Sequence, residues 1–284
     1  MATNEEITNT EKMPPLYIVT GATDNMGSVI TRKLAAQGKA VLLACRDEAK
    51  AQNYAARLRN ETRNPDISVL QLDLSSFEQV QDFVERLKAL NRPVAALVNN
   101  AGTLPRHSKI SPNGYEHTVQ VNFLSTALLS LSVYPLIVDG GTIVLSTSVS
   151  RRFVSLPYEF PAVSHFTQIG AYAQSKLALT LFSIYMSTVM KTRRLRVNCV
   201  NPGVINTSVM ALHRWLDRAA DYIVNPLPDP DSGVVPTMRA LESNDTGFIF
   251  MGSDRQIKTS TMLKNRDVFI KLCNDTMRII KKYL

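Results

Sequence analysis

The chain has 284 residues, of which 45% are hydrophobic and 20% charged, a balance that is ordinary for a soluble globular domain. Three cysteines without a CxxC pair exclude a disulfide scaffold and a zinc finger, and they suit a reducing compartment such as the cytoplasm. The formal net charge of +8 would attract nucleic acid or anionic lipid. No zinc-knuckle, RNP or helix-turn-helix signature accompanies the charge, so we expect no nucleic-acid partner.

The chain is predicted to hold one domain over residues 14–284, preceded by a loose polar arm over residues 1–13. The arm has no basic start followed by an apolar run, so it does not resemble a signal peptide. Residues 118–138 carry no charge, but they include Gln120, Asn122 and Pro135. A spanning helix is predominantly apolar, so this stretch predicts a buried helix of a soluble domain.

Short apolar runs alternate with segments of helical length. The runs are Leu16–Val19, Val41–Ala44, Val69–Leu72, Ala95–Val98, Ile143–Leu145, Val197–Val200 and Phe248–Met251. The helical segments are Met26–Gln37, Glu48–Arg63, Phe77–Leu90, Tyr115–Leu131, Tyr172–Met190 and Ser232–Leu241. Continuous apolar runs are typical of strands buried on both faces, and alternation with helices indicates a parallel sheet. We therefore predict an α/β fold, a Rossmann-type doubly wound sheet of about seven strands that binds ligands beyond its carboxyl edge.

The first run leads directly into a turn with glycines at 21 and 27. Such a turn, opening a helix, presents backbone N–H groups and the positive end of the helix dipole to a phosphate. Many loops hold two glycines, so an ordinary strand–helix turn is the alternative. The residues of this turn assigned to a cofactor are Gly21, Thr23, Asn25, Met26 and Gly27.

The ends of the second and third runs carry the residues expected to face the adenosine. An acidic residue after the second strand would accept from a ribose 2′-hydroxyl, whereas an Arg would pair with a 2′-phosphate. Arg46 occupies that place, which favours NADP(H) over NAD(H), unless Arg46 is only a solvated surface residue. Asp73, after the third strand, is expected to accept from an adenine amino group, to cap the next helix, or to do both.

Tyr172 and Lys176 are spaced i,i+4 and share one face of a predicted helix. A phenol has a pKa near 10, and a neighbouring ammonium lowers it, which makes tyrosine usable as an acid or base near neutral pH. On its own, this spacing is a common accident.

Further motifs accompany this pair. They are Asn99-Asn100-Ala101-Gly102, Val121-Asn122, Ser146-Thr147-Ser148 and the segment from Asn201 to Thr207. Together with the glycine turn they resemble the short-chain dehydrogenase/reductase family from Leu16 to Met251. A narrower resemblance, to the retinol-dehydrogenase-like group, rests on Cys45-Arg46-Asp47, on residues 114–122 and on residues 246–250.

The resemblance implies a role for each catalytic residue. Tyr172 would be the acid or base, and Lys176 would lower its pKa and hold the nicotinamide ribose. Ser148 would donate to the substrate oxygen, and Asn122 would support a water-linked proton path. The cofactor groove would be formed by Asp73, Leu74, Asn99, Ala101, Gly102, Pro202, Gly203, Ile205 and Thr207.

Two residues depart from the family's pattern in the first turn. Asn25 replaces the family's middle glycine; asparagine tolerates the left-handed region, but its side chain would crowd a pyrophosphate. Asp24 stands where some NADP-binding relatives place a basic residue, which opposes a 2′-phosphate.

Two segments are expected to shape the substrate site. Tyr172 lies 24 positions after Ser148, a longer gap than in many family members. Residues 151–170 are therefore predicted to loop over the site. Ser146 remains a second candidate for the serine that donates to the substrate oxygen. The substrate loop, residues 204–230, is rich in apolar side chains and indicates a lipophilic small molecule, or otherwise a core-packing helix. The isolated histidines 165 and 213 predict no metal site.

The tail, residues 261–284, carries six basic and two acidic residues, with apolar residues at helical spacing. It is expected to pack on its own domain or on a partner subunit of a homo-oligomer. A basic amphipathic helix lying on a membrane and a frayed end are the less favoured alternatives.

These observations predict an NADP(H)-dependent oxidoreductase that moves a hydride between nicotinamide and a carbonyl or alcohol carbon. A catalytically silent regulatory or scaffold protein is the first alternative; the intact catalytic set argues against it, and Asn25 keeps it open. An NAD-dependent alcohol dehydrogenase is the second, which Arg46 disfavours.

Overall fold

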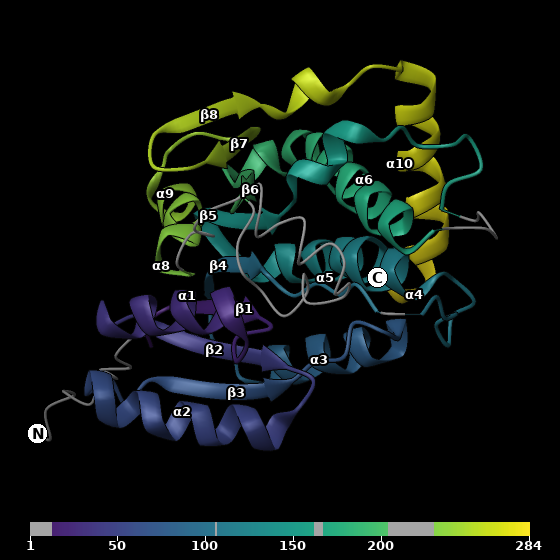
Figure 1. Ribbon diagram of the computed structural model, residues 1–284. Coiled ribbons are helices and arrows are strands. Elements are labelled where there is room, and N and C mark those ends of the chain that lie inside the picture. The colour runs from purple at the N-terminus through teal and green to yellow at the C-terminus, as the bar shows by residue number, and fades with distance from the viewer. Residues whose placement is uncertain (1–12, 106, 162–166, 204–229) are drawn as a thin grey trace, which may run out of the picture.

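A computed structural model describes residues 13–105, 107–161, 167–203 and 230–284, and Figure 1 shows their arrangement. One sheet runs through the described residues in the order β3-β2-β1-β4-β5-β6-β7-β8. The strands are β1 (Leu16–Thr20), β2 (Ala40–Cys45), β3 (Ile67–Gln71), β4 (Val94–Asn99), β5 (Ile137–Ser146), β6 (Arg196–Asn201), β7 (Phe248–Met251) and β8 (Arg255–Lys258). The first seven strands pair in parallel, and this confirms the predicted fold class.

The eighth strand differs from the prediction. It pairs antiparallel with β7 at the edge of the sheet, and its sequence, Arg-Gln-Ile-Lys, is polar and partly exposed. An edge strand with one partner does not need a continuous apolar run, so the pattern that found the buried strands missed it.

Helices cover both faces of the sheet. They are α1 (Asn25–Ala36), α2 (Glu48–Thr62), α3 (Phe77–Ala89), α4 (His117–Val119), α5 (Ser125–Val133), α6 (Gln168–Val189), α8 (Pro230–Gly233), α9 (Val235–Glu242) and α10 (Arg266–Ile280). Neighbouring residues of a strand point to opposite faces, so Val19 and Leu43 join the core under α1, α2 and α9, while Ile18 and Leu42 join the core under α3, α5 and α6. This double burial explains the continuous apolar runs.

The uncharged stretch is a core helix. Within the described ranges, His117–Leu136 is the stretch long and apolar enough to cross a membrane, and most of it is buried inside the fold. It combines α4, a π-helical turn over Gln120–Leu124 and α5, and it packs against α6. The predicted buried helix is confirmed.

The C-terminal tail packs on its own domain. Helix α10 packs against α6 (Figure 1) and buries Leu272, Cys273 and Ile280. Beyond it, the ring of Tyr283 lies 4.8 Å from that of Phe77, at the start of α3. The favoured alternative for the tail is therefore the one observed.

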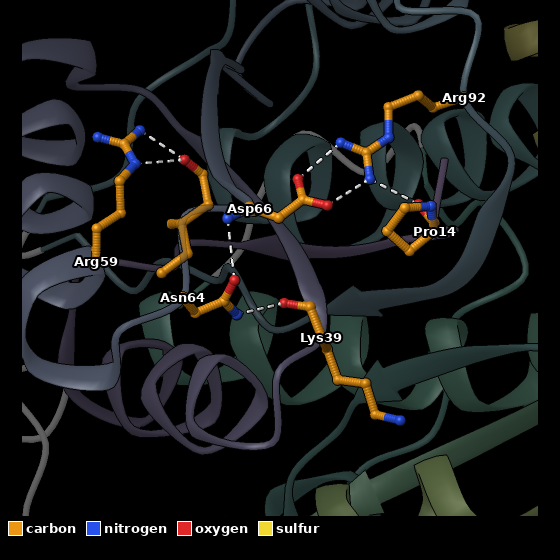
Figure 2. A network of polar contacts seen from close by, with 7 residues as sticks. Pro14, Lys39, Arg59, Asn64, Asp66 and Arg92 are labelled. Carbon is orange, nitrogen blue, oxygen red and sulfur yellow. Dashed lines mark hydrogen bonds and ion pairs between the residues drawn. The ribbon is translucent and has the colours of Figure 1, made fainter. Parts of the chain in front are cut away.

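The amino edge of the sheet is closed by a paired polar network (Figure 2). Arg92, before β4, contacts both carboxylate oxygens of Asp66 at 2.8 Å and donates to the carbonyl oxygen of Pro14. Asn64 accepts from the backbone N–H of Asp66 and donates to the carbonyl oxygen of Lys39. These contacts join the segments that enter β1, β2, β3 and β4, at the edge opposite the candidate site.

Candidate active site

The turn between β1 and α1 requires glycine at two positions. A Cβ atom on Gly27 would lie 2.0 Å from the carbonyl oxygen of Gly21, which itself has a φ of +62°. Asn25 has a φ of +38°, so it adopts the positive φ that the sequence analysis argued it would tolerate. The side chain of Asp24 does not cap α1; its carboxylate forms an ion pair with Lys50 instead.

The loop after β4 is attached to this turn. Asn100 Nδ2 donates to the carbonyl oxygen of Thr20 at 3.2 Å, and the backbone N–H of Ala101 donates to Thr20 Oγ1 at 2.9 Å. Asn99 Nδ2 donates to Ser130 Oγ, while Asn99 Oδ1 is buried and has no hydrogen-bond partner in the described part of the chain. The chain changes direction across the sheet between β1 and β4, and ligands bind at such a switch point in doubly wound sheets.

A nicotinamide dinucleotide fits these residues. The unpaired Asn99 Oδ1 needs a donor, because a buried acceptor without one costs free energy. At Gly102, an added Cβ would lie 3.3 Å from Lys176 Nζ and 3.4 Å from Asn122 Oδ1, so only a glycine leaves this corner open. The turn before α1 supplies backbone N–H groups for a pyrophosphate.

The ribose end of the groove holds more positive charge than the sequence analysis found. Arg46 is exposed directly after β2, and no ion pair to it occurs among the described residues. Lys50, in the first turn of α2, pairs with Asp24 and therefore offsets the negative charge expected to oppose a 2′-phosphate. Lys50 was not predicted from the sequence as part of this site; the available signal was its position in the first turn of the helix that follows Arg46.

Asp73 does not cap the following helix. Its carboxylate accepts from the backbone N–H of Ser75 at 2.8 Å, while Ser76 caps α3 by accepting from the N–H of Gln79. The capping alternative is therefore wrong, because Asp73 lies three residues before Ser76, the N-cap of α3. Leu74, beside it, is buried.

The catalytic candidates meet at the carboxyl edge of β5. A side-chain hydrogen bond joins the hydroxyl groups of Tyr172 and Ser148. Lys176 Nζ lies 5.7 Å from the centre of the Tyr172 ring and donates to the carbonyl oxygen of Ser146 at 2.8 Å. Of the two serines, Ser148 therefore directs its hydroxyl to Tyr172, while Ser146 contributes a backbone oxygen to Lys176.

Helix α6 positions this pair and begins earlier than predicted. It starts at Gln168 rather than at Tyr172, and Thr167 caps it by accepting from the backbone N–H of Gly170. The additional turn places Tyr172 inside the helix, where its backbone is fixed.

Asn122 lies in the π-helical turn and holds the loop after β4 against α6. Its Oδ1 accepts from the N–H of Thr103 at 2.7 Å, and its Nδ2 donates to the carbonyl oxygen of Thr103 at 3.0 Å and to Ser175 Oγ at 3.3 Å. Single π turns inside α-helices are frequent at functional sites. The water-linked proton path through Asn122 stays a prediction.

Burial shifts the pKa values of the two central groups in opposite senses. It lowers the pKa of Lys176 to about 8 and raises the pKa of Tyr172 above its usual value, against the effect of the hydrogen bond from Ser148. The net shift of the Tyr172 pKa in this structure is therefore upward, opposite to the lowering that the sequence analysis expected from Lys176. Desolvation of the phenol is the largest cause of this rise, and Lys176 is itself buried and donates to the carbonyl oxygen of Ser146.

The remaining assigned residues follow β6 or lie elsewhere. Pro202 and Gly203 come directly after β6, and the N–H of Gly203 is held by Asn201 Oδ1 at 3.2 Å. Ile205, Thr207 and nearly all of the substrate loop lie outside the described residues, as do histidines 165 and 213. Over the described ranges, no group of three or more His, Cys, Asp or Glu residues could hold a metal ion.

The insert after Ser148 begins with a 3₁₀ turn, Val149–Phe153. Arg151 is buried in this turn, and Phe160 packs against Phe123 with ring centres 5.8 Å apart. Arg151 donates to the carbonyl oxygen of Ser148. The insert is thus anchored to the core on both sides of Val154.

Comparison with known proteins gives concordant matches. The family model of short chain dehydrogenases matches residues 16–215. Polyprenol dehydrogenase of Mus musculus is 32% identical, over 94% of this chain and 85% of that protein. Retinol dehydrogenase 12 of Homo sapiens is 29% identical, over 72% of this chain and 65% of that protein.

Solved structures agree in fold. A short chain dehydrogenase from Escherichia coli CFT073 complexed with NADPH superposes with a TM-score of 0.64 at 27% identity, over 84% of this chain and 95% of that one. A short-chain dehydrogenase from Sphingobium yanoikuyae in complex with NADPH has a TM-score of 0.66 at 22% identity, over 84% of this chain and 87% of that one.

Proposed function

The chain belongs to the short-chain dehydrogenase family, and on this premise we propose that it is an NADP(H)-dependent oxidoreductase acting on a lipophilic carbonyl compound or alcohol. The observation that carries the proposal is the hydrogen-bonded pair of Tyr172 and Ser148 beside the buried Lys176, at the mouth of the cofactor turn. The names of its relatives support the substrate class, because polyprenol and retinol are both lipophilic alcohols.

The two hydroxyl groups divide the acid–base work. When bound, the nicotinamide supplies or accepts the hydride. Tyr172 gives its proton to the carbonyl oxygen in reduction, and takes it from the alcohol in oxidation. Ser148 donates a hydrogen bond to the same oxygen and stabilises the charge that develops there. The hydrogen bond between them keeps the two hydroxyl groups close enough to serve one substrate oxygen.

Lys176 and Asn122 support this pair. With a pKa of about 8, Lys176 remains mostly protonated at neutral pH, and its charge favours the phenolate as the proton leaves Tyr172. Asn122 fixes the backbone of Thr103, which keeps Gly102 open next to Lys176 Nζ. In this arrangement Lys176 would also hold the nicotinamide ribose, and Asn99 would bind the cofactor at the end of β4.

The cofactor preference rests on the exposed Arg46. A charge-assisted hydrogen bond is worth about 1.5–3 kcal/mol, so Arg46→Ala should weaken NADPH binding by about 10- to 150-fold and leave NADH nearly unchanged. Asp24→Ser should strengthen NADPH binding further, since it frees Lys50. Arg57→Ala, which removes an exposed arginine within α2 instead, is the matched control.

Fluorescence titrations of the full chain with each cofactor test this preference. Equal affinity of the wild type for NADPH and NADH, or an Arg46→Ala change that weakens both alike, would overturn the NADP assignment. Screening aldehydes, ketones and alcohols for NADPH or NADP⁺ turnover tests the reaction itself. Tight NADPH binding without turnover of any of them would favour the regulatory or scaffold alternative.

A further inference from the structure

The protein has a hollow close to the catalytic residues but apart from their hydroxyl groups. It has a volume of about 360 Å³, which is within the range of small-molecule pockets, and it lies between the 3₁₀ turn after Ser148, α6 and the start of α10. Leu177 and Leu181 line it from α6. At about 100° per residue, they lie roughly 140° and 180° around the helix from Tyr172, so the hollow is separate from the catalytic hydroxyl groups.

The lining combines positive charge with apolar walls. Arg151, Arg152 and Lys264 contribute to it, and none of its lining residues is acidic. Arg152 and Lys264 are exposed, and neither forms an ion pair within the parts of the chain that are described. The apolar walls are Val154, Leu156, Leu177, Leu181, Met262 and Val268.

Arg151 is the unusual member of this set. Its side chain is 1% exposed, and one of its nitrogens, Nη1, donates to the carbonyl oxygen of Ser148. Its Nε and Nη2 have no hydrogen-bond partner among the described residues. The charged group near it is Arg152, which repels it, and the neighbouring thiol of Cys199 is neutral because burial raises its pKa to about 11.

A buried guanidinium cannot relieve this situation by losing its proton, because its pKa lies too high. An uncompensated charge in a low-dielectric environment is costly, and an anion nearby reduces that cost. The start of α10 cannot compensate this charge, because a helix N-terminus is itself the positive end of the dipole and the Oδ1 of Asn265 already accepts from the N–H groups of Asp267 and Val268. The hollow therefore lacks an anion and offers an apolar wall beside the place for it.

We propose that this hollow is a binding site for an amphipathic carboxylate, such as a fatty acid. Its chain lies against Leu177, Leu181 and Val268, and its carboxylate pairs with Arg152 and Lys264 at the rim, above Arg151. Since Arg151 also holds the carbonyl oxygen of Ser148, the carboxylate draws the guanidinium away from Ser148 and lowers turnover. The site is thus regulatory and distinct from the substrate site.

Calorimetric titration of the full chain with decanoate tests the binding. The methyl ester of decanoate is the uncharged analogue, and acetate is the carboxylate without a chain. We expect decanoate to bind at least about tenfold more tightly than either. Equal binding of the methyl ester would overturn the proposal, because it would leave only an apolar cavity. Binding is measured without turnover, so its outcome does not depend on the proposed reaction.

Charge reversals at the rim locate the site. Lys264→Glu and Arg152→Glu should each weaken decanoate binding by about tenfold or more, whereas Lys281→Glu, an exposed lysine near the C-terminus outside the hollow, should not. These exposed positions tolerate the change even if Arg151→Met fails to fold. Loss of binding in the Lys281 variant as well, or in none of the three, would overturn the assignment to this hollow.

Kinetics test the link to Ser148. With any substrate that the enzyme turns over, decanoate should lower kcat without raising KM, and Lys264→Glu should abolish that inhibition. A rise in KM alone would place decanoate in the substrate site and overturn the regulatory role.

Discussion

The polar side chains at the amino edge of the sheet are mostly hydrogen-bonded, whereas several at the carboxyl edge have no partner in the described part of the chain. At the amino edge, both oxygens of Asp66 and both ends of the Asn64 amide are paired (Figure 2), and among the described residues of that network only Arg92 Nε is buried without a partner. Among the described residues, nine buried side-chain atoms lack a partner, and seven of these lie at the carboxyl edge. The seven are Asn99 Oδ1, Asn100 Oδ1, Thr147 Oγ1, Ser150 Oγ, Arg151 Nε, Arg151 Nη2 and Gln174 Oε1.

This difference separates stability from function within one sheet. A buried polar atom without a partner costs free energy, so native proteins keep few of them, and usually for a reason. The amino edge holds strands together, while the carboxyl edge keeps donors and acceptors ready for ligands. Substitutions at the two edges should therefore have opposite signatures.

The largest effect on activity is expected at Tyr172. General acid–base groups contribute about 10²–10⁴-fold, so Tyr172→Phe should lower kcat by that factor. Its NADPH affinity and thermal midpoint should stay near those of the wild type, because the phenol is not a main cofactor anchor. Steady-state kinetics and a cofactor titration measure both. Turnover close to the wild type would remove Tyr172 as the acid.

The two serines sharpen the comparison at the same edge. Ser148→Ala should lower kcat by about 10²–10³-fold, as the loss of one donor to a developing charge does. Ser146→Ala should change kcat little, because Ser146 serves Lys176 through its backbone carbonyl oxygen. The kcat values of the two variants decide between them. An inactive Ser146 variant beside an active Ser148 variant would reverse the assignment.

The amino edge should show the opposite signature. Arg92→Ala leaves Asp66 without its partner and should lower the free energy of unfolding by about 1–3 kcal/mol, with kcat unchanged. Urea unfolding and steady-state kinetics measure the two quantities. Arg57→Ala, which breaks an exposed pair with Glu61, is the control and should cost less than about 0.5 kcal/mol. A similar loss of unfolding free energy in both variants would show that the network stabilises the fold no more than an exposed ion pair does.

Lys176 should give the most pH-dependent effect on stability. Below a pH of about 8 it is protonated in both the folded and the unfolded chain, so the cost of burying its charge is complete. Between its folded pKa of about 8 and its unfolded value near 10.4, the unfolded chain binds more protons, and stability rises with pH.

The slope expected from this lysine is at most about 1.4 kcal/mol per pH unit. Unfolding of the wild type and of Lys176→Met, measured from pH 7 to 10, should differ by that slope, with the wild type gaining relative to the variant as pH rises. Parallel pH curves for the two proteins would contradict the lowered pKa of Lys176.

The sequence by itself determined the order of the elements and most of the fold. Burial of a strand on both faces leaves a continuous apolar run, so seven strands could be found from local pattern alone. The motifs follow those strands, and parallel strands carry their carboxyl ends to one edge, so the sequence also indicated which residues would gather. The sequence did not indicate β8, because this edge strand is polar. It also placed the start of α6 one turn too late, because the boundary is set by a capping threonine.

Only the tertiary structure decided how the gathered residues interact. The choice between Ser146 and Ser148 depends on which hydroxyl reaches Tyr172, a residue 24 or more positions away. The rise in the pKa of Tyr172 and the burial of Arg151 depend on solvent exclusion by segments far apart in the chain. Local patterns record which face of an element is buried, whereas desolvation and hydrogen bonding at a site depend on everything packed around it.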